Sequence, residues 1–149
     1  MYRKHKFILC FIFILVAALS FHFQVDYSWI ASEGITVVSI ILAIYMTSFS
    51  SLISSDLGER LQHVVDCKMK NKSQLGVLKG YLSFAVLAGV INIVVSCIAI
   101  ILSKETTKAI YQSDVYYGIS ALGMAMLAVN FTVMLFLFLF MVNRQLWNK

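Results

Sequence analysis

The sequence predicts an all-α, polytopic membrane protein in which a single domain, residues 1–149, folds as a four-transmembrane-helix bundle. Apolar residues make up 60% of the chain and charged residues 13%, a balance typical of a protein that has lipid as its solvent. The charges avoid four long apolar stretches, each close to the roughly 20 residues that cross a bilayer as a helix. We predict spans at about 7–23, 35–53, 81–102 and 119–142.

The first span resembles a signal peptide, and the second is less apolar than the others. Basic residues precede the apolar part of span 7–23, and Ala18 and Ser20 are small, so this span also has the layout of a cleavable signal peptide. Its removal would leave the orientation of the other three spans unchanged. Serine and threonine dilute span 35–53, so we expect neighbouring helices to hold it in the membrane.

The last two spans are more apolar. Leucine, isoleucine, valine and phenylalanine are frequent enough in span 81–102 for it to insert by itself, and span 119–142 completes the bundle. Gly34, Gly80 and Gly118 stand just before the second, third and fourth spans. We interpret these glycines as flexible points where the chain enters the bilayer.

The basic residues predict the orientation. A net charge of +5 also suggests a nucleic-acid partner, but the charges are distributed as the positive-inside rule requires. If the N-terminus is cytoplasmic, only Lys104 and Lys108 of the 12 lysines and arginines fall outside. We therefore predict a multi-pass protein of the cell inner (cytoplasmic) membrane, with both termini cytoplasmic, the lipid bilayer as its partner and no nucleic acid bound.

The connector 54–80 is predicted to contain a short amphipathic helix on the cytoplasmic membrane surface. Leu57, Leu61 and Val64 recur at helical spacing, and Asp56 with Glu59 resembles a capping box. The alternative is that the second span simply continues past the membrane. In the first interpretation three lysines lie near the lipid headgroups: Lys68, Lys70 and Lys72.

Small residues recur every three or four positions on three of the spans, the pattern that lets helices approach closely in lipid. On the second span this stripe is rich in hydroxyl groups, which leaves two interpretations. In the first, the stripe packs against another helix. In the second, the stripe lines a polar pore in an oligomer of this chain. The stripes are Thr36, Ser39, Ala43, Thr47, Ser50 and Ser54; Ala85, Gly89, Asn92, Ser96 and Ala99; and Gly118, Ala121, Ala125, Ala128 and Thr132.

Asn92 and Asn130 are the most polar side chains deep within the spans. Because an unpaired amide is costly in hydrocarbon, each should face protein or water, and the two could bond each other. We expect them to hold helices together, with a conduction or gating site as the alternative.

Aromatic residues near the span ends match the belts that membrane proteins place at the two lipid interfaces. We assign Tyr27, Trp29, Tyr111, Tyr116 and Tyr117 to the outer belt and Tyr2, Tyr81 and Trp147 to the inner belt.

The sequence lacks the residues that several activities require. No charged residue lies inside a predicted span, which disfavours proton-coupled export and charged-substrate transport. The sequence contains no phosphate-binding glycine loop, nucleophile elbow or metal-binding histidine motif, so we expect no enzyme activity, no metal and no cofactor. Cys10, Cys67 and Cys97 are expected to be free thiols.

The layout of residues 31–103 resembles small membrane subunits of bacterial antiviral systems. The matching features are a span ending "YMTSFSSLISS", a basic connector containing "ERLQ", and the span "YLSFAVLAGVINIVVSCIAIILS". The pattern is similar to the RexB-like membrane component of the lambdoid Rex exclusion system and, more distantly, to the Kiwa membrane subunit. The resemblance implies an effector in phage exclusion that lets ions leak across the cytoplasmic membrane. Rex-type loops contain prolines, whereas this chain has none.

These observations favour a non-catalytic, channel-like or depolarising effector of phage defence that acts as a homo-oligomer or with another membrane subunit. A membrane immunity protein that blocks a pore-forming toxin by contact between helices is the first alternative. A holin-like protein is the next, although holins commonly end in a longer charged tail than "NRQLWNK".

Overall fold

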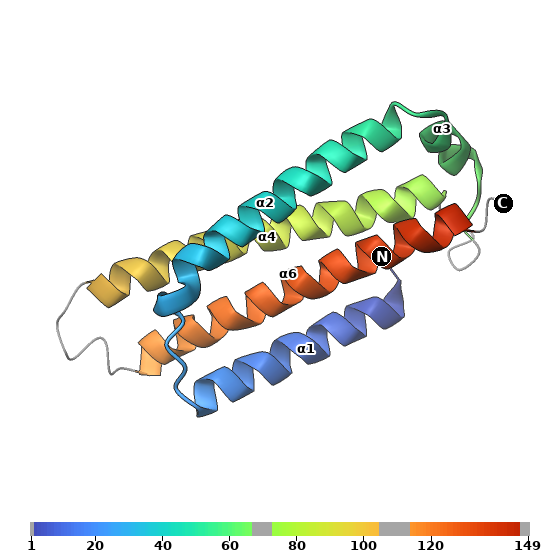
Figure 1. Ribbon diagram of the computed structural model, residues 1–149. Coiled ribbons are helices and arrows are strands. Elements are labelled where there is room, and N and C mark those ends of the chain that lie inside the picture. The colour runs from blue at the N-terminus through green and yellow to red at the C-terminus, as the bar shows by residue number, and fades with distance from the viewer. Residues whose placement is uncertain (1, 67–72, 105–113, 147–149) are drawn as a thin grey trace.

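The computed structural model describes residues 2–66, 73–104 and 114–146, and it confirms the all-α prediction. Four long helices, α1 (Arg3–His22), α2 (Ser28–Ile53), α4 (Gln74–Lys104) and α6 (Asp114–Leu146), lie side by side (Figure 1). A short helix, α3 (Asp56–His63), follows α2. By length and composition each long helix can cross a membrane.

Each long helix contains nearly all of one predicted span and extends beyond it. At 1.5 Å per residue, the 31 residues of α4 make a helix of about 46 Å, longer than the roughly 30 Å hydrocarbon core. Gly34, Gly80 and Gly118 consequently lie inside α2, α4 and α6. Their assignment as flexible entrance points was wrong, because these helices begin before the apolar stretches do.

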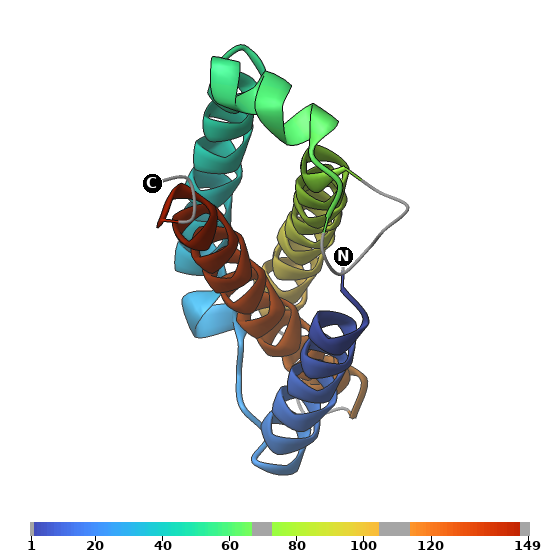
Figure 2. The ribbon, with the colours of Figure 1, turned by 90° about the vertical axis from the view of Figure 1, so that its right-hand side faces the viewer.

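The long helices form an up-and-down arrangement with α6 at its centre. The α6 helix packs against both α1 and α4, while α2 packs mainly against α4. Figure 2 shows α1 and α4 on the same side of α6, and their backbones do not approach within 8 Å in the described residues. The bundle is therefore open between α1 and α4.

One end of the bundle carries α3, the start of α1 and the end of α6 (Figures 1 and 2). We call it the α3 end. The chain turns at Ser54, so α3 is a separate helix and not a continuation of α2. Its N-cap is Ser55, whose hydroxyl accepts a hydrogen bond from the Gly58 backbone at 3.4 Å. Hence the helix begins where expected, but Asp56 is not its cap.

The main core lies towards the α3 end, where apolar side chains of α1, α4 and α6 meet around Leu9, Tyr81 and Val133. A second, smaller core surrounds Tyr27 at the opposite end. The belt assignment of Tyr27, Tyr81 and Tyr116 was therefore wrong, since all three are buried. Trp29, in contrast, is 82% exposed, as a belt residue should be.

Candidate functional site

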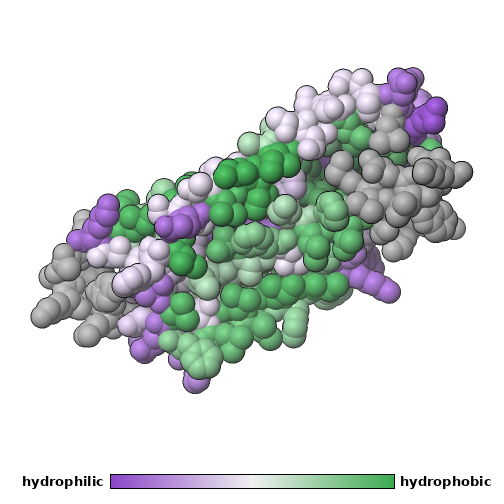
Figure 3. Space-filling view, viewed as in Figure 1, coloured by the Kyte–Doolittle hydropathy of each residue, from purple (hydrophilic) through white to green (hydrophobic). Residues whose placement is uncertain are grey.

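The hydroxyl-rich stripe of α2 faces away from the rest of the chain. All six of its residues are exposed, whereas α2 packs inward through a different stripe: Ala31, Gly34, Val38 and Ile41. Figure 3 shows pale, weakly polar residues along α2 at the upper edge of the molecule. Because this stripe is exposed in the single chain, the packing interpretation requires a helix of another chain. We call this stripe the α2 hydroxyl face, made of Thr36, Ser39, Ala43, Thr47, Ser50 and Ser54.

Hydroxyls on this face bond to the backbone of their own helix. Thr36 donates to the Ser32 carbonyl oxygen at 3.1 Å, and Thr47 donates to that of Ala43 at 2.9 Å. Ser54 donates to the Ser50 carbonyl oxygen at 3.1 Å. Bonds of this kind satisfy a hydroxyl without a partner helix. The face can therefore meet lipid, another helix or water without leaving these donors unpaired.

The stripes on α4 and α6 lie where the sequence predicts. Every member of the α4 stripe is buried, and the α6 stripe is buried or half-buried. Gly89 shows why small residues are needed, because a Cβ atom there would lie 2.9 Å from the Leu42 methyl groups of α2. Thr132, on α6, satisfies its hydroxyl on the Ala128 carbonyl oxygen at 2.9 Å.

The two intramembrane asparagines have different environments. The Asn130 amide donates to the Met126 carbonyl oxygen at 2.9 Å and to the Ala88 carbonyl oxygen of α4 at 3.4 Å. Asn92 is 0% exposed, and neither of its amide atoms has a hydrogen-bond partner. The two side chains thus do not bond each other as the sequence suggested. Asn130 links α6 to α4, while Asn92 is an unpaired polar group inside the bundle.

Tyr27 is a buried anchor that the sequence did not reveal. Its hydroxyl shares a 2.7 Å hydrogen bond with Ser96 of α4. Its ring packs so closely on Gly123 of α6 that a Cβ atom there would come within 2.4 Å. Burial raises the pKa of the Tyr27 phenol, against a smaller lowering by the bond to Ser96, so the phenol stays neutral. A glycine inside an apolar helix was the available signal for this close approach.

A second group of long-range hydrogen bonds joins the elements at the α3 end. Tyr2 donates to the buried carboxylate of Asp66 at 2.7 Å. The Tyr81 hydroxyl lies 2.6 Å from His5 Nδ1, and it accepts a 3.2 Å bond from the Tyr2 backbone. His5 in turn stacks on Phe136 of α6, with ring centroids 4.3 Å apart. These contacts tie the start of α1 to the connector, α4 and α6.

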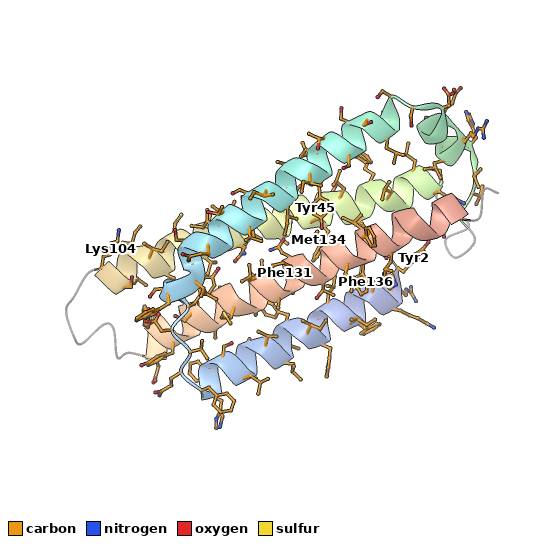
Figure 4. The ribbon with its side chains drawn as sticks, viewed as in Figure 1. Tyr2, Tyr45, Lys104, Phe131, Met134 and Phe136 are labelled. Carbon is orange, nitrogen blue, oxygen red and sulfur yellow. The ribbon has the colours of Figure 1, made fainter. Side chains whose placement is uncertain are left out.

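Two cavities between helices border α6. One, of about 180 Å³, lies among α2, α4 and α6, with Tyr45 and Met134 on facing walls (Figure 4). The other, of about 500 Å³, lies among α1, α4 and α6, and Lys6 and Cys10 are among its lining residues. Both are lined mainly by aliphatic and aromatic side chains, so neither resembles a catalytic cleft.

The remaining predicted residues give no reactive constellation. Cys10 and Cys97 are free, exposed thiols. In the described part of the chain, histidine, cysteine, aspartate and glutamate form no group that could hold a metal ion. Lys68, Lys70 and Lys72 lie outside the described residues, as do Cys67, Tyr111 and Trp147.

Together these features define a multi-pass membrane protein whose most distinctive surface is the α2 hydroxyl face. Searches against protein families, characterised proteins and solved structures found no match to this chain.

Proposed function

We propose that the chain is a non-catalytic protein of the inner membrane that assembles through the α2 hydroxyl face and raises membrane permeability. The observation that carries this proposal is that all six residues of that face are exposed in the single chain. Small, self-satisfied hydroxyls allow helices to pack closely in lipid and also tolerate water. The face is thus suited both to contact between copies and to lining a path between them.

The interior of one chain is a poor route for ions. Asn92 and Ser96 are 0% exposed and Asn130 is 4% exposed, so these polar side chains are enclosed by neighbouring helices. An ion passing through one chain would have to displace packed side chains, at a high cost in hydrocarbon. This favours a path between several chains. The resemblance of residues 31–103 to the Rex membrane component favours phage defence as the setting.

The test is regulated expression in bacteria that carry a dye reporting the membrane potential. We expect the wild-type protein to depolarise the membrane and the triple variant Ser39→Leu, Thr47→Leu, Ser50→Leu to leave the potential intact. Ile40→Leu with Ile44→Leu is the matched control, since both isoleucines are exposed on α2 and carry no hydroxyl. An unchanged potential with well-expressed wild-type protein contradicts the proposal.

The same face supports a second candidate function, an immunity protein that docks on the helices of a pore-forming toxin. The bonds from Thr36, Thr47 and Ser54 to their own helix favour it, because this face needs no water to satisfy those donors. The dye assay separates the two functions, because they predict opposite effects on the membrane potential. An immunity protein protects cells from depolarisation by a co-expressed toxin, whereas a permeability effector depolarises them alone.

A further inference from the structure

The cavity of about 500 Å³ is a groove among α1, α4 and α6, and none of its lining residues belongs to α2. Its walls are α1, with Leu9 and Phe13, and α4, with Phe84 and Leu87, and its floor is α6, with Met126. It exists because both wall helices pack on α6 while their backbones stay more than 8 Å apart. At the α3 end, the contact between His5 and Tyr81 bridges the two walls. The groove is therefore bounded at that end.

The groove has a polar end and an apolar body. Lys6, one residue after the bridging His5, is the charged residue among the lining side chains. Beyond it the lining is aliphatic and aromatic apart from the Cys10 thiol. From Lys6 to Phe13 the α1 wall rises about 10 Å, which fits within one leaflet of a hydrocarbon core that is roughly 30 Å thick.

We propose that this groove binds an anionic phospholipid, with an acyl chain along the apolar walls and the phosphate at the Lys6 ammonium. The charge is complementary, and Arg3 is also exposed on the same turn of α1. Beyond Lys6 the lining is mainly aliphatic and aromatic, as an acyl chain requires.

This inference is independent of the proposed function, because no residue of the α2 hydroxyl face lines the groove. A lipid bound here would fill the open side of the bundle and hold α1 in place, since among the described helices only α6 comes within 8 Å of the α1 backbone.

Cys10 offers a direct probe, since its exposed thiol lines the groove. The experiment uses the full-length chain with Cys67→Ser and Cys97→Ser, purified in detergent and delipidated. Maleimide labelling of Cys10 is followed while phosphatidylglycerol or phosphatidylethanolamine is added. One basic residue near anionic lipid contributes about 1 kcal/mol, equivalent to a roughly five-fold preference. We expect Cys10 to be protected at roughly five-fold lower phosphatidylglycerol than phosphatidylethanolamine.

Matched variants test whether the lipid preference depends on Lys6. Lys6→Gln should abolish the preference for phosphatidylglycerol, and Lys6→Arg should keep it. Lys4→Gln makes the same charge change on the same helix at an exposed residue that does not line the groove, and it too should keep the preference. A second protein, with Cys97 as its only cysteine, should show no protection, because Cys97 lies outside the groove.

Three results would overturn the proposal. The first is equal protection by the two lipids, and the second is equal protection of Cys10 and Cys97. The third is loss of the preference in Lys4→Gln as well as Lys6→Gln. None of these readouts depends on ion flux, so failure of the lipid site and failure of the proposed function are distinguishable.

Discussion

Replacing Asn92 with leucine should stabilise the protein, although the change removes the most polar side chain of the predicted span 81–102. Both amide atoms are buried without a hydrogen-bond partner, and an uncompensated amide costs about 1–3 kcal/mol in protein substitution series. Leucine keeps the branched outline but is larger, and overpacking offsets about 1 kcal/mol of the gain. We therefore expect a net stabilisation of up to about 2 kcal/mol. Asn92→Ala, which cannot overpack, should be neutral or stabilising.

The matched substitution is Asn130→Leu, which should lower the free energy of unfolding, whereas Asn92→Leu should raise it. The Asn130→Leu change removes a bond to the Met126 carbonyl oxygen of the same helix and a bond to the Ala88 carbonyl oxygen of α4. A hydrogen bond between membrane helices, such as the second, contributes about 0.6 kcal/mol on average, up to about 1.7. The assay is reversible unfolding by a denaturing detergent, followed by circular dichroism. If Asn92→Leu and Asn92→Ala both destabilise the protein by more than about 1 kcal/mol, the Asn92 amide has a partner in solution and the reasoning fails.

The remaining predictions concern the Tyr27 anchor and use the same unfolding assay. Gly123→Ala should destabilise the protein by about 1–3 kcal/mol, because the added Cβ atom would lie 2.4 Å from the Tyr27 ring. A Cβ atom added at Gly118 meets nothing within 4 Å, so Gly118→Ala should leave the stability of the protein unchanged or raise it by up to about 1 kcal/mol. Equal losses of stability in Gly118→Ala and Gly123→Ala would contradict the close packing of Tyr27 on Gly123. Tyr27→Phe and Ser96→Ala each remove the same 2.7 Å hydrogen bond, so each should cost about 1 kcal/mol and the double variant less than their sum. Simple additivity would show that the bond is absent.

The long helices were predictable because hydrocarbon imposes a strong constraint on composition. A stretch of about 20 uncharged, apolar residues has few alternatives to a membrane helix. The stripe on α4 was predictable for a related reason. In span 81–102, Gly89, Asn92 and Ser96 share one line among large apolar residues, so that line is where a neighbouring helix comes close.

The orientation of α2 was not predictable in this way. This helix carries two stripes with helical spacing, the hydroxyl face and a second one that includes Ala31, Gly34 and Val38. Periodicity identifies both stripes, but it does not say which one meets α4. The packing uses the stripe with fewer hydroxyls. The hydroxyl face remains exposed, and there Thr36 and Thr47 donate hydrogen bonds to their own backbone.

The polar contacts within the bundle were also out of reach from the sequence. Tyr27 and Ser96 are 69 residues apart, and Tyr2 and Asp66 are 64 apart. Tyrosine is amphipathic and fits equally well at a lipid interface or in a core with a partner for its hydroxyl. Only the positions of the helices decide between these environments, which explains why three tyrosines were assigned to the wrong one.

The central claim is that four apolar helices cross the inner membrane and leave both chain ends in the cytoplasm. Alkaline phosphatase fusions test it most directly, since this enzyme becomes active only outside the cytoplasm. We expect a fusion after Lys104 to be active and fusions after Asp66 and Leu146 to be inactive. An active fusion after Leu146, or an inactive one after Lys104, would contradict the predicted topology and the proposals that depend on it.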